Sequence, residues 1–200
     1  MGDFFDVHES IERHGRDLPH WQQGEVLQFV TFRLGDSLPR EKLTHWQSER
    51  KAWLEGRSPT WSAEEESEYH RLFTWRVEKW LDAGFGSCLL KEKRHRNVLE
   101  KTLMKFQGLR VEHYAWVIMP NHVHSLFKPL EEMHSLIKAW KGVSARLIGR
   151  GSIWQKRYRD TMIRDNQHFA NVVRYIRRNP ADLPVGSYTL WESPRAKGIR

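Results

Sequence analysis

The sequence predicts an α+β protein in which helices pack against an antiparallel sheet. Three segments rich in β-branched and aromatic residues predict strands, at 25–34, 111–119 and 122–128. Segments with apolar residues at helical spacing predict helices, at 40–82, 94–106, 130–147 and 165–179. This order, with short connections, predicts an α+β sandwich.

The boundaries of the elements suggest one main domain with an added helical segment. Residues 1–24 mix charges with few apolar positions, so we expect an irregular leader. The main domain spans 25–180 and carries a helical insertion at about 40–82, where Ser62 and Glu65 have the spacing of a capping box. Residues 152–163 are expected to be irregular, and the basic tail 181–200 is interrupted by Pro and Gly.

The positive charge of the chain is concentrated near its C-terminus. Residues 138–200 contain 14 Lys and Arg against 4 Asp and Glu, and the whole chain has a net charge of +8. Such a region is typical of nucleic-acid binders, although a solvated surface gives the same pattern. The ten tryptophans include candidates for stacking on unpaired bases, although we expect most of them in the core.

Composition also excludes several classes of protein. No apolar run approaches the length of a membrane span, and the N-terminus lacks the basic and apolar regions of a signal peptide. We therefore expect a cytoplasmic, nucleoid-associated protein with no membrane partner. The single cysteine, Cys88, excludes an internal disulfide and a cysteine-based zinc cluster.

A pair of histidines is the first candidate site. His122 and His124 lie two residues apart in a predicted strand, so both imidazoles project to one face. Pro120 and Asn121 precede them and predict a bulge or a two-residue turn that directs this face. A His-x-His pair can bind a metal and leave open positions for a phosphate oxygen, although core or surface histidines are an alternative.

A tyrosine in the last predicted helix is the second candidate. Tyr175 and Asn179 are four residues apart and share a helix face. A phenol with a pKa of about 10 is a poor nucleophile unless a base, a metal or a positive field favours the phenolate. Arg174, Arg177 and Arg178 supply positive charge nearby, but a packed structural tyrosine gives the same pattern.

These two stretches together resemble a known family. Met119-Pro-Asn-His-Val-His124, followed by a final helix with Tyr175-Ile-Arg-Arg-Asn-Pro180, resembles the REP-associated tyrosine transposases of bacteria. These are single-tyrosine transposases of the HUH endonuclease family. Trp154-Gln155 and the strand Phe29–Leu34 are also similar to that group, and the resemblance runs over residues 25–180.

The resemblance implies a fold, a reaction and a site. The fold would be a ferredoxin-like sandwich with the His-x-His on a central strand. His122, His124 and Asn179 would bind Mg²⁺ or Mn²⁺, and Tyr175 would attack single-stranded DNA beside a palindromic hairpin, forming a 5′-phosphotyrosine that can rejoin strands. Relatives act as monomers or as homodimers.

The DNA contacts and the competing functions rest on charge and spacing. Besides the arginines around Tyr175, the candidates for DNA backbone contacts are Lys138, Lys141, Lys156, Arg157, Arg159 and Arg164. A histidine-triad hydrolase needs a third histidine where this chain has Leu126, and no second His-x-Ser/Thr pair supports a two-histidine phosphoesterase. A non-catalytic DNA- or RNA-binding protein on the same fold stays open, as do the target sequence and the choice between a mobile transposase and a domesticated endonuclease.

Overall fold

The structure, a computed structural model, describes residues 2–14, 20–57 and 62–200. Contacts within the chain divide it into two compact units. Unit 1 comprises residues 1–35 and 89–200, and unit 2 comprises residues 36–88. The segments 1–24 and 181–200 thus lie in the same unit as the central sheet.

The centre of unit 1 is a five-stranded antiparallel sheet in the order β6-β3-β5-β4-β7. Its strands are β3 (Gln28–Arg33), β4 (Val111–Ile118), β5 (His122–Pro129), β6 (Arg159–Met162) and β7 (Thr189–Glu192). Helix α4 (Lys93–Met104) follows β3 in unit 1, and α5 (Met133–Ile148) joins β5 to β6. The sequence β3-α4-β4-β5-α5-β6, with the fourth strand beside the first, is the ferredoxin-like arrangement, so the predicted fold class is confirmed.

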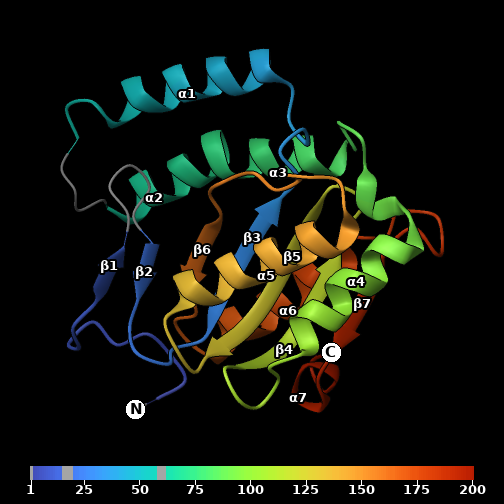
Figure 1. The fold of residues 1–200 in the computed structure, drawn as a ribbon. Coiled ribbons are helices and arrows are strands. Elements are labelled where there is room, and N and C mark those ends of the chain that lie inside the picture. The colour runs from blue at the N-terminus through green and yellow to red at the C-terminus, as the bar shows by residue number, and fades with distance from the viewer. Residues whose placement is uncertain (1, 15–19, 58–61) are drawn as a thin grey trace. The chain divides into compact units, whose positions relative to one another are not determined.

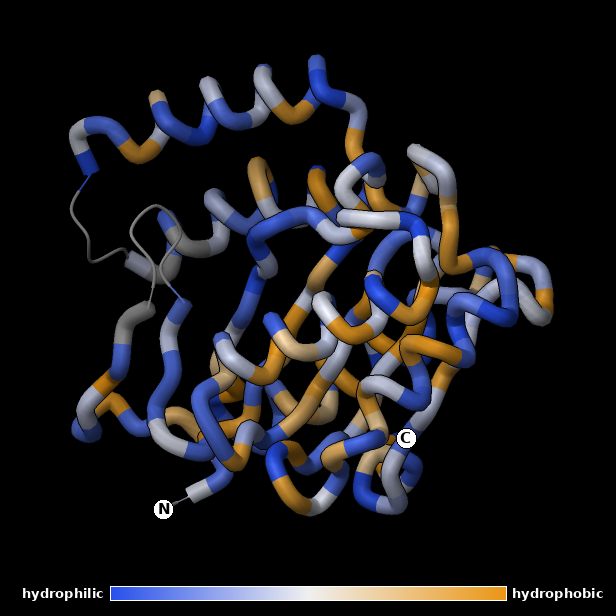
Figure 2. The backbone as a smooth tube through the Cα atoms, in the orientation of Figure 1, coloured by the Kyte–Doolittle hydropathy of each residue, from blue (hydrophilic) through white to orange (hydrophobic). Residues whose placement is uncertain are grey.

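Helices cover both faces of this sheet. Alternate strand residues such as Val30 and Val123 pack against α4 and α5, whereas Phe29 and Leu126 pack against α6 (Asn166–Arg178) and the short α7 (Pro194–Lys197). Figure 1 shows α4 and α5 in front of the sheet and α6 behind it. Strand alternation thus sorts side chains into two cores, and Figure 2 shows the apolar positions of the strands between these layers.

The central strand β5 is buried along almost its whole length, and the turn before it is tightly held. Met119 N donates to His122 O at 2.9 Å, so Pro120 and Asn121 form a two-residue turn between β4 and β5. Leu34 N donates to Asn121 O, and Leu90 N donates to Pro120 O. These bonds fix the start of β5, where both histidines lie.

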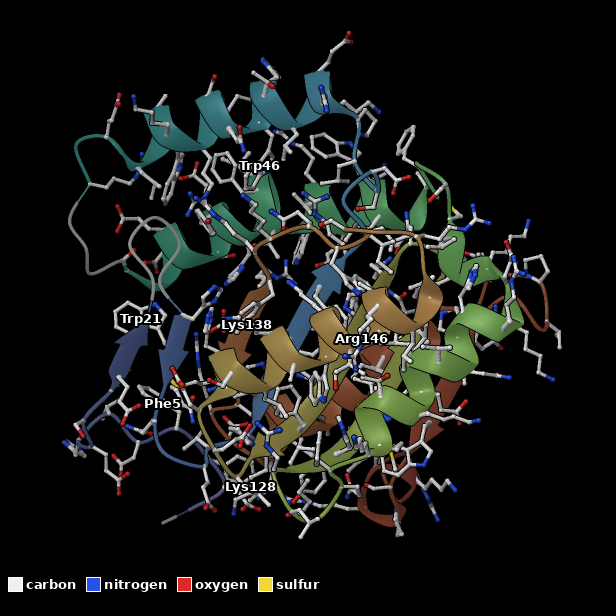
Figure 3. All side chains as sticks on the ribbon, in the orientation of Figure 1. Phe5, Trp21, Trp46, Lys128, Lys138 and Arg146 are labelled. Atoms are coloured by element: carbon white, nitrogen blue, oxygen red, sulfur yellow. The ribbon has the colours of Figure 1, made fainter. Side chains whose placement is uncertain are left out.

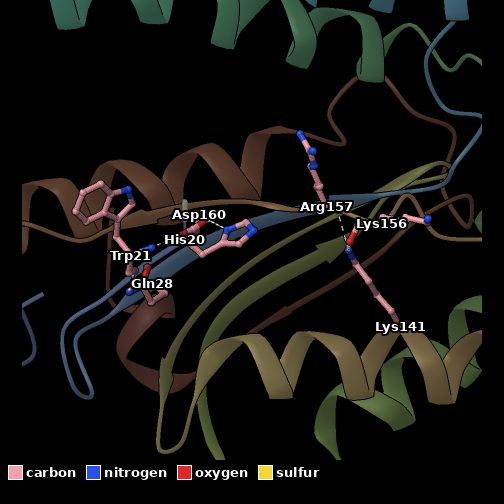
Figure 4. Close-up of polar contacts among 7 residues, drawn as sticks. All are labelled: His20, Trp21, Gln28, Lys141, Lys156, Arg157 and Asp160. Atoms are coloured by element: carbon pink, nitrogen blue, oxygen red, sulfur yellow. Dashed lines mark hydrogen bonds and ion pairs between the residues drawn. The ribbon is translucent and has the colours of Figure 1, made fainter. Parts of the chain in front are cut away.

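The expectation of an irregular N-terminal segment was wrong. Strands β1 (Glu12–His14) and β2 (His20–Gln22) pair with each other, and β2 lies beside the edge strand β6. His20 Nδ1 lies 2.5 Å from Asp160 Oδ1, and Trp21 N donates to the other oxygen at 3.1 Å (Figure 4). The His20 ring stacks on Tyr158 at 3.7 Å. Side chains therefore attach β2 to the sheet edge, which the polar composition of this segment did not indicate.

Three further expectations from the sequence were wrong. Residues 159–162 form the edge strand β6, and residues 189–192 form β7 at the other edge. Both strands are short and only partly buried, so they lack the apolar alternation that reveals longer strands. Leu147 fits the apolar spacing that predicts the helix 130–147 and was expected to face inward, yet it is 59% exposed in α5.

Unit 2 is helical, as predicted. It contains α1 (Arg40–Leu54), α2 (Ala63–Tyr69), a π-helical turn (His70–Thr74) and α3 (Trp75–Asp82). The capping box is confirmed, because Glu65 N donates to Ser62 Oγ at 3.2 Å and Ser62 N donates to the Glu65 carboxylate at 3.0 Å.

Aromatic side chains hold unit 2 together. Trp46 and Trp53 of α1 pack on Phe73, and Trp46, labelled in Figure 3, also donates its indole N–H to the Phe73 carbonyl. The two ends of the unit meet, since Ser87 N donates to the Asp36 carboxylate at 2.8 Å. Unit 2 is therefore a helical insertion between β3 and α4 in the chain. None of the described helices is long and apolar enough to cross a membrane.

Candidate active site

His122 and His124 lie side by side on the face of β5 that α6 covers. Both side chains are completely buried, and their Nε2 atoms are 3.0 Å apart. The two rings are nearly perpendicular, with centroids 4.6 Å apart. The predicted common face is therefore observed, with one nitrogen of each ring directed at the same point.

The outer nitrogens of both rings are held by neighbouring polar side chains. Asn121 Oδ1 lies 2.7 Å from His122 Nδ1, and Thr31 Oγ1 lies 2.8 Å from His124 Nδ1. An amide oxygen can only accept, so His122 carries its proton on Nδ1 and its Nε2 has a lone pair. The Thr31 hydroxyl can accept from His124 Nδ1–H, which leaves the second Nε2 as a lone pair as well.

Tyr175 approaches this pair from α6. Its hydroxyl lies 3.4 Å from His124 Nε2, and its ring meets the His124 ring edge-on at 5.1 Å. Phe29 of β3 packs edge-on against the same tyrosine ring. The sequence offers Asp165 or Asn166 as the cap of α6, and in the structure Asp165 accepts from His168 N at 2.7 Å. The helix therefore begins at a fixed point and holds the hydroxyl beside the histidines.

His124 is neutral in this setting. Burial, together with the positive charge of Arg159, lowers the pKa of His124 to about 3. A neutral imidazole is the form that binds a metal, and it is a weak proton acceptor for a phenol.

The donors present fit a divalent cation. Two ligand atoms about 2.1 Å from an octahedral ion and about 90° apart are separated by ~3.0 Å, which is the separation of the two Nε2 atoms. Two lone pairs facing each other at this distance repel unless a cation or a proton lies between them. Among the described residues, no group of three His, Cys, Asp or Glu side chains is placed to hold a metal, so a third protein ligand has to be of another type.

Asn179 offers such a ligand. It follows α6 one turn after Tyr175, and its backbone N–H donates to the Tyr175 carbonyl at 2.9 Å. Its Oδ1 is buried and has no hydrogen-bond partner in the described part of the chain. A buried amide oxygen without a partner is unfavourable, and a bound cation would satisfy it.

The basic residues predicted to contact DNA are distributed widely, and several make internal contacts. Lys138, Lys156, Arg157, Arg164 and Arg178 are exposed, and Figure 3 shows Lys138 extending from α5.

Lys141 holds a neighbouring loop in place. Its Nζ donates to the carbonyls of Gln155, Lys156 and Arg157, as Figure 4 shows for the latter two. Burial and the nearby charge of Arg33 lower the pKa of Lys141 to about 8. Lys141 thus positions the loop that exposes Lys156 and Arg157.

The arginines of α6 point to the C-terminal segment. Arg177 donates to the Glu192 carboxylate at 2.9 Å, to the Ile199 carbonyl at 2.7 Å and to the Ala196 carbonyl at 3.0 Å. Arg174 donates to the carbonyl of Arg200 at 2.7 Å. These two side chains fasten β7 and the C-terminal residues to the tyrosine helix.

Three residues at the site were not singled out from the sequence. Two of them, Thr31 and Arg33, lie at alternate positions of β3. Once the pairing of β3 with β5 is known, strand periodicity places both on the histidine face. Asn121 was assigned only to the turn, yet its side chain also contacts His122. Cross-strand contacts carry no signal in a single sequence.

The fold and the site together define a class: a ferredoxin-like α+β protein in which a tyrosine on a helix faces a histidine pair on the central strand. The family model described as "Transposase IS200 like" matches residues 86–179, a segment that contains both histidines, Tyr175 and Asn179. This segment of the chain is therefore similar to the IS200-like transposases.

Comparisons with curated proteins and with solved structures gave different results. No curated protein matches the chain. Among solved structures, one described as "Structure of the REP associates tyrosine transposase bound to a REP hairpin" is similar, with 18% identity and a TM-score of 0.47. That match covers 84% of this chain and 73% of the other.

Proposed function

We propose that the protein is a metal-dependent single-stranded DNA endonuclease and strand transferase that uses Tyr175 as its nucleophile. The observation that carries this proposal is the convergence of the Tyr175 hydroxyl and the Nε2 atoms of His122 and His124 at 3.0–3.4 Å. A structural tyrosine needs no such histidine pair. Two imidazole Nε2 atoms 3.0 Å apart, beside a hydroxyl, suit a phosphodiester substrate and a divalent cation.

The reaction is a transesterification. The phenolic oxygen of Tyr175 forms a bond to phosphorus while the bond from phosphorus to the 3′ oxygen breaks. The phenol loses its proton, and the departing 3′ oxygen gains one. The DNA 5′ end stays attached to tyrosine, so a free 3′-OH can reverse the step and rejoin strands without an external energy source.

Each residue has one role in this scheme. His122, His124 and Asn179 would hold Mg²⁺ or Mn²⁺, with Asn121 and Thr31 orienting the two imidazoles. The ion, when bound, would act as a Lewis acid on a phosphate oxygen. The substrate we propose is a hairpin-forming palindrome with an adjoining single strand, which would place the protein with the nucleoid in the cytoplasm.

All the residues of the proposed site come from one chain. Tyr175 lies beside its own His124, and Arg177 fastens its helix to β7 of the same chain. We therefore propose that catalysis needs no tyrosine from a second copy.

A covalent-adduct assay tests this function. End-labelled hairpin DNA from palindromes flanking the gene is incubated with protein and Mg²⁺ or Mn²⁺, and products are separated on a denaturing protein gel. We expect a labelled adduct with the wild type and none with Tyr175→Phe or His122→Ala. If all three proteins bind the hairpin and none forms an adduct or cuts it, the chain is a non-catalytic DNA-binding protein on the same fold.

A further inference from the structure

Two arginines project from the sheet on the same face as the histidine pair. Arg33 of β3 is the cross-strand partner of His122, and Thr31 is the partner of His124. On the other side of β3, Arg159 of β6 is the partner of Thr31. Partners in an antiparallel sheet point to the same face with Cβ atoms about 5 Å apart. Arg33 is thus beside His122, and Arg159 is separated from His124 by the strand β3.

The electrostatics of the site agree with this placement. Arg159 is close enough for its charge to act on the His124 imidazole. Arg33 is partly buried, its Nη1 donates to the Leu34 carbonyl at 3.3 Å, and its charge also acts on Lys141 of α5. Holding guanidinium groups near neutral imidazoles in a desolvated site is unfavourable, and an anionic ligand between them would offset that cost.

The arginines nearest to Tyr175 in sequence are already engaged elsewhere. Arg174 and Arg177 donate to carbonyls of the C-terminal segment, and Arg177 also binds Glu192. Their donors are directed at Glu192 of β7 and at residues that follow β7. Arg33 and Arg159, by contrast, start from strand positions on the histidine face.

We propose that Arg33 and Arg159 bind the non-bridging oxygens of the scissile phosphate and stabilise the charge that these oxygens gain in the transition state. This inference rests on the proposed function and adds to it a phosphate-binding pair that comes from β3 and β6. A guanidinium offers paired N–H donors that match phosphate oxygens, and donors fixed before the reaction cost no reorganisation during it.

The first test measures phosphate contact without catalysis. In a Tyr175→Phe background and without metal, the affinity for a short single strand is measured over a range of salt concentrations. Each lost phosphate contact on single-stranded DNA reduces the slope of log K against log salt by about 0.7. We expect that reduction for Arg33→Gln and for Arg159→Gln, and about 1.4 for the double variant.

The matched control is Lys101→Gln. Lys101 is exposed on α4, on the face of the sheet opposite the histidines, and its replacement removes the same charge. Its slope should equal that of the parent protein. Equal slopes for Arg33→Gln, Arg159→Gln and the control would overturn the proposal, provided that circular dichroism shows all of them folded.

The second test measures the chemical step. At saturating DNA and metal, each Arg→Gln variant should lower the single-turnover rate of adduct formation by about 10²–10³-fold, as loss of one transition-state donor does elsewhere. Arg33→Lys keeps the charge and should recover part of the rate. Rates equal to that of Lys101→Gln would refute the role in catalysis and leave the tyrosine reaction intact.

The two tests separate failure of this inference from failure of the proposed function. If the wild type forms no adduct but the arginine variants change the salt slope, the pair binds phosphate and the tyrosine reaction is wrong. If the wild type reacts and the variants match the control in both tests, the arginine pair is wrong and the tyrosine reaction stands.

Discussion

Replacement of Thr31 by valine isolates the contact that orients His124. The Thr31 hydroxyl lies 2.8 Å from His124 Nδ1 in a fully buried setting. Valine has nearly the same shape but cannot accept or donate a hydrogen bond. The substitution therefore removes the partner of one ring nitrogen without opening a cavity.

The magnitude follows from burial. A buried polar group that loses its partner costs about 1–3 kcal/mol, so the free energy of unfolding should fall by roughly that amount. Without the hydroxyl, the imidazole is no longer held with its Nε2 lone pair toward the metal position. Loss of such an orienting partner lowers metal affinity by about 10–100-fold, equivalent to ~1.4–2.7 kcal/mol of binding free energy.

Calorimetric titration with Mn²⁺ measures the affinity, and urea unfolding measures the stability. Thr31→Ser is the matched control, because it keeps the hydroxyl and loses only a methyl group, so its Mn²⁺ affinity should stay close to that of the wild type. Equal Mn²⁺ affinities for wild type and Thr31→Val, both folded, would refute the orienting role of the hydroxyl. Absence of Mn²⁺ binding by the wild type would refute the metal site itself.

Three other outcomes are expected. Because the folded-state pKa values of His124 and His113, about 3 and about 4, lie below the ~6.5 of an unfolded histidine, the unfolded chain takes up protons first as the pH falls. The free energy of unfolding should then be highest above pH ~6.5. Between that pH and about pH 4 it should decrease by roughly 1.4 kcal/mol per pH unit for each histidine. A flat profile of this free energy in urea unfolding would contradict the prediction. A mixture of Tyr175→Phe and His122→Ala proteins should form no DNA adduct, since both groups of one site come from one chain; restored activity would show an exchanged tyrosine helix. Arg177→Ala should destabilise the protein by about 2 kcal/mol in urea unfolding, because it removes charged hydrogen bonds to a β7 carboxylate and two C-terminal carbonyls.

Local patterns predicted the parts of the site that depend on strand and helix periodicity. The spacing of His122 and His124 predicted a common face, and both Nε2 atoms are directed at one point. The irregularity at Pro120 (a bulge or a turn) and a helix cap at Asp165 or Asn166 were also predicted, because each depends on residues a few positions away.

Features that depend on distant partners were not predicted. The edge strands β6 and β7 are four residues each and only partly buried, and they become strands by pairing with β3 and β4. The role of β2 depends on the contact between His20 and Asp160, which are 140 positions apart. A short segment of the sequence contains no information about either the strand pairing or the contact between His20 and Asp160.

The sequence by itself therefore determined the fold class, the histidine pair and the helix that carries Tyr175, because these follow from periodicity and capping over short distances. Only the tertiary structure decided that Tyr175 lies beside His124, that Arg177 turns to the C-terminal segment, and that Arg33 lies across from His122. The physical reason is strand register. Which side chains become neighbours across a sheet is fixed by pairing between segments far apart in the chain, and a single sequence does not record that pairing.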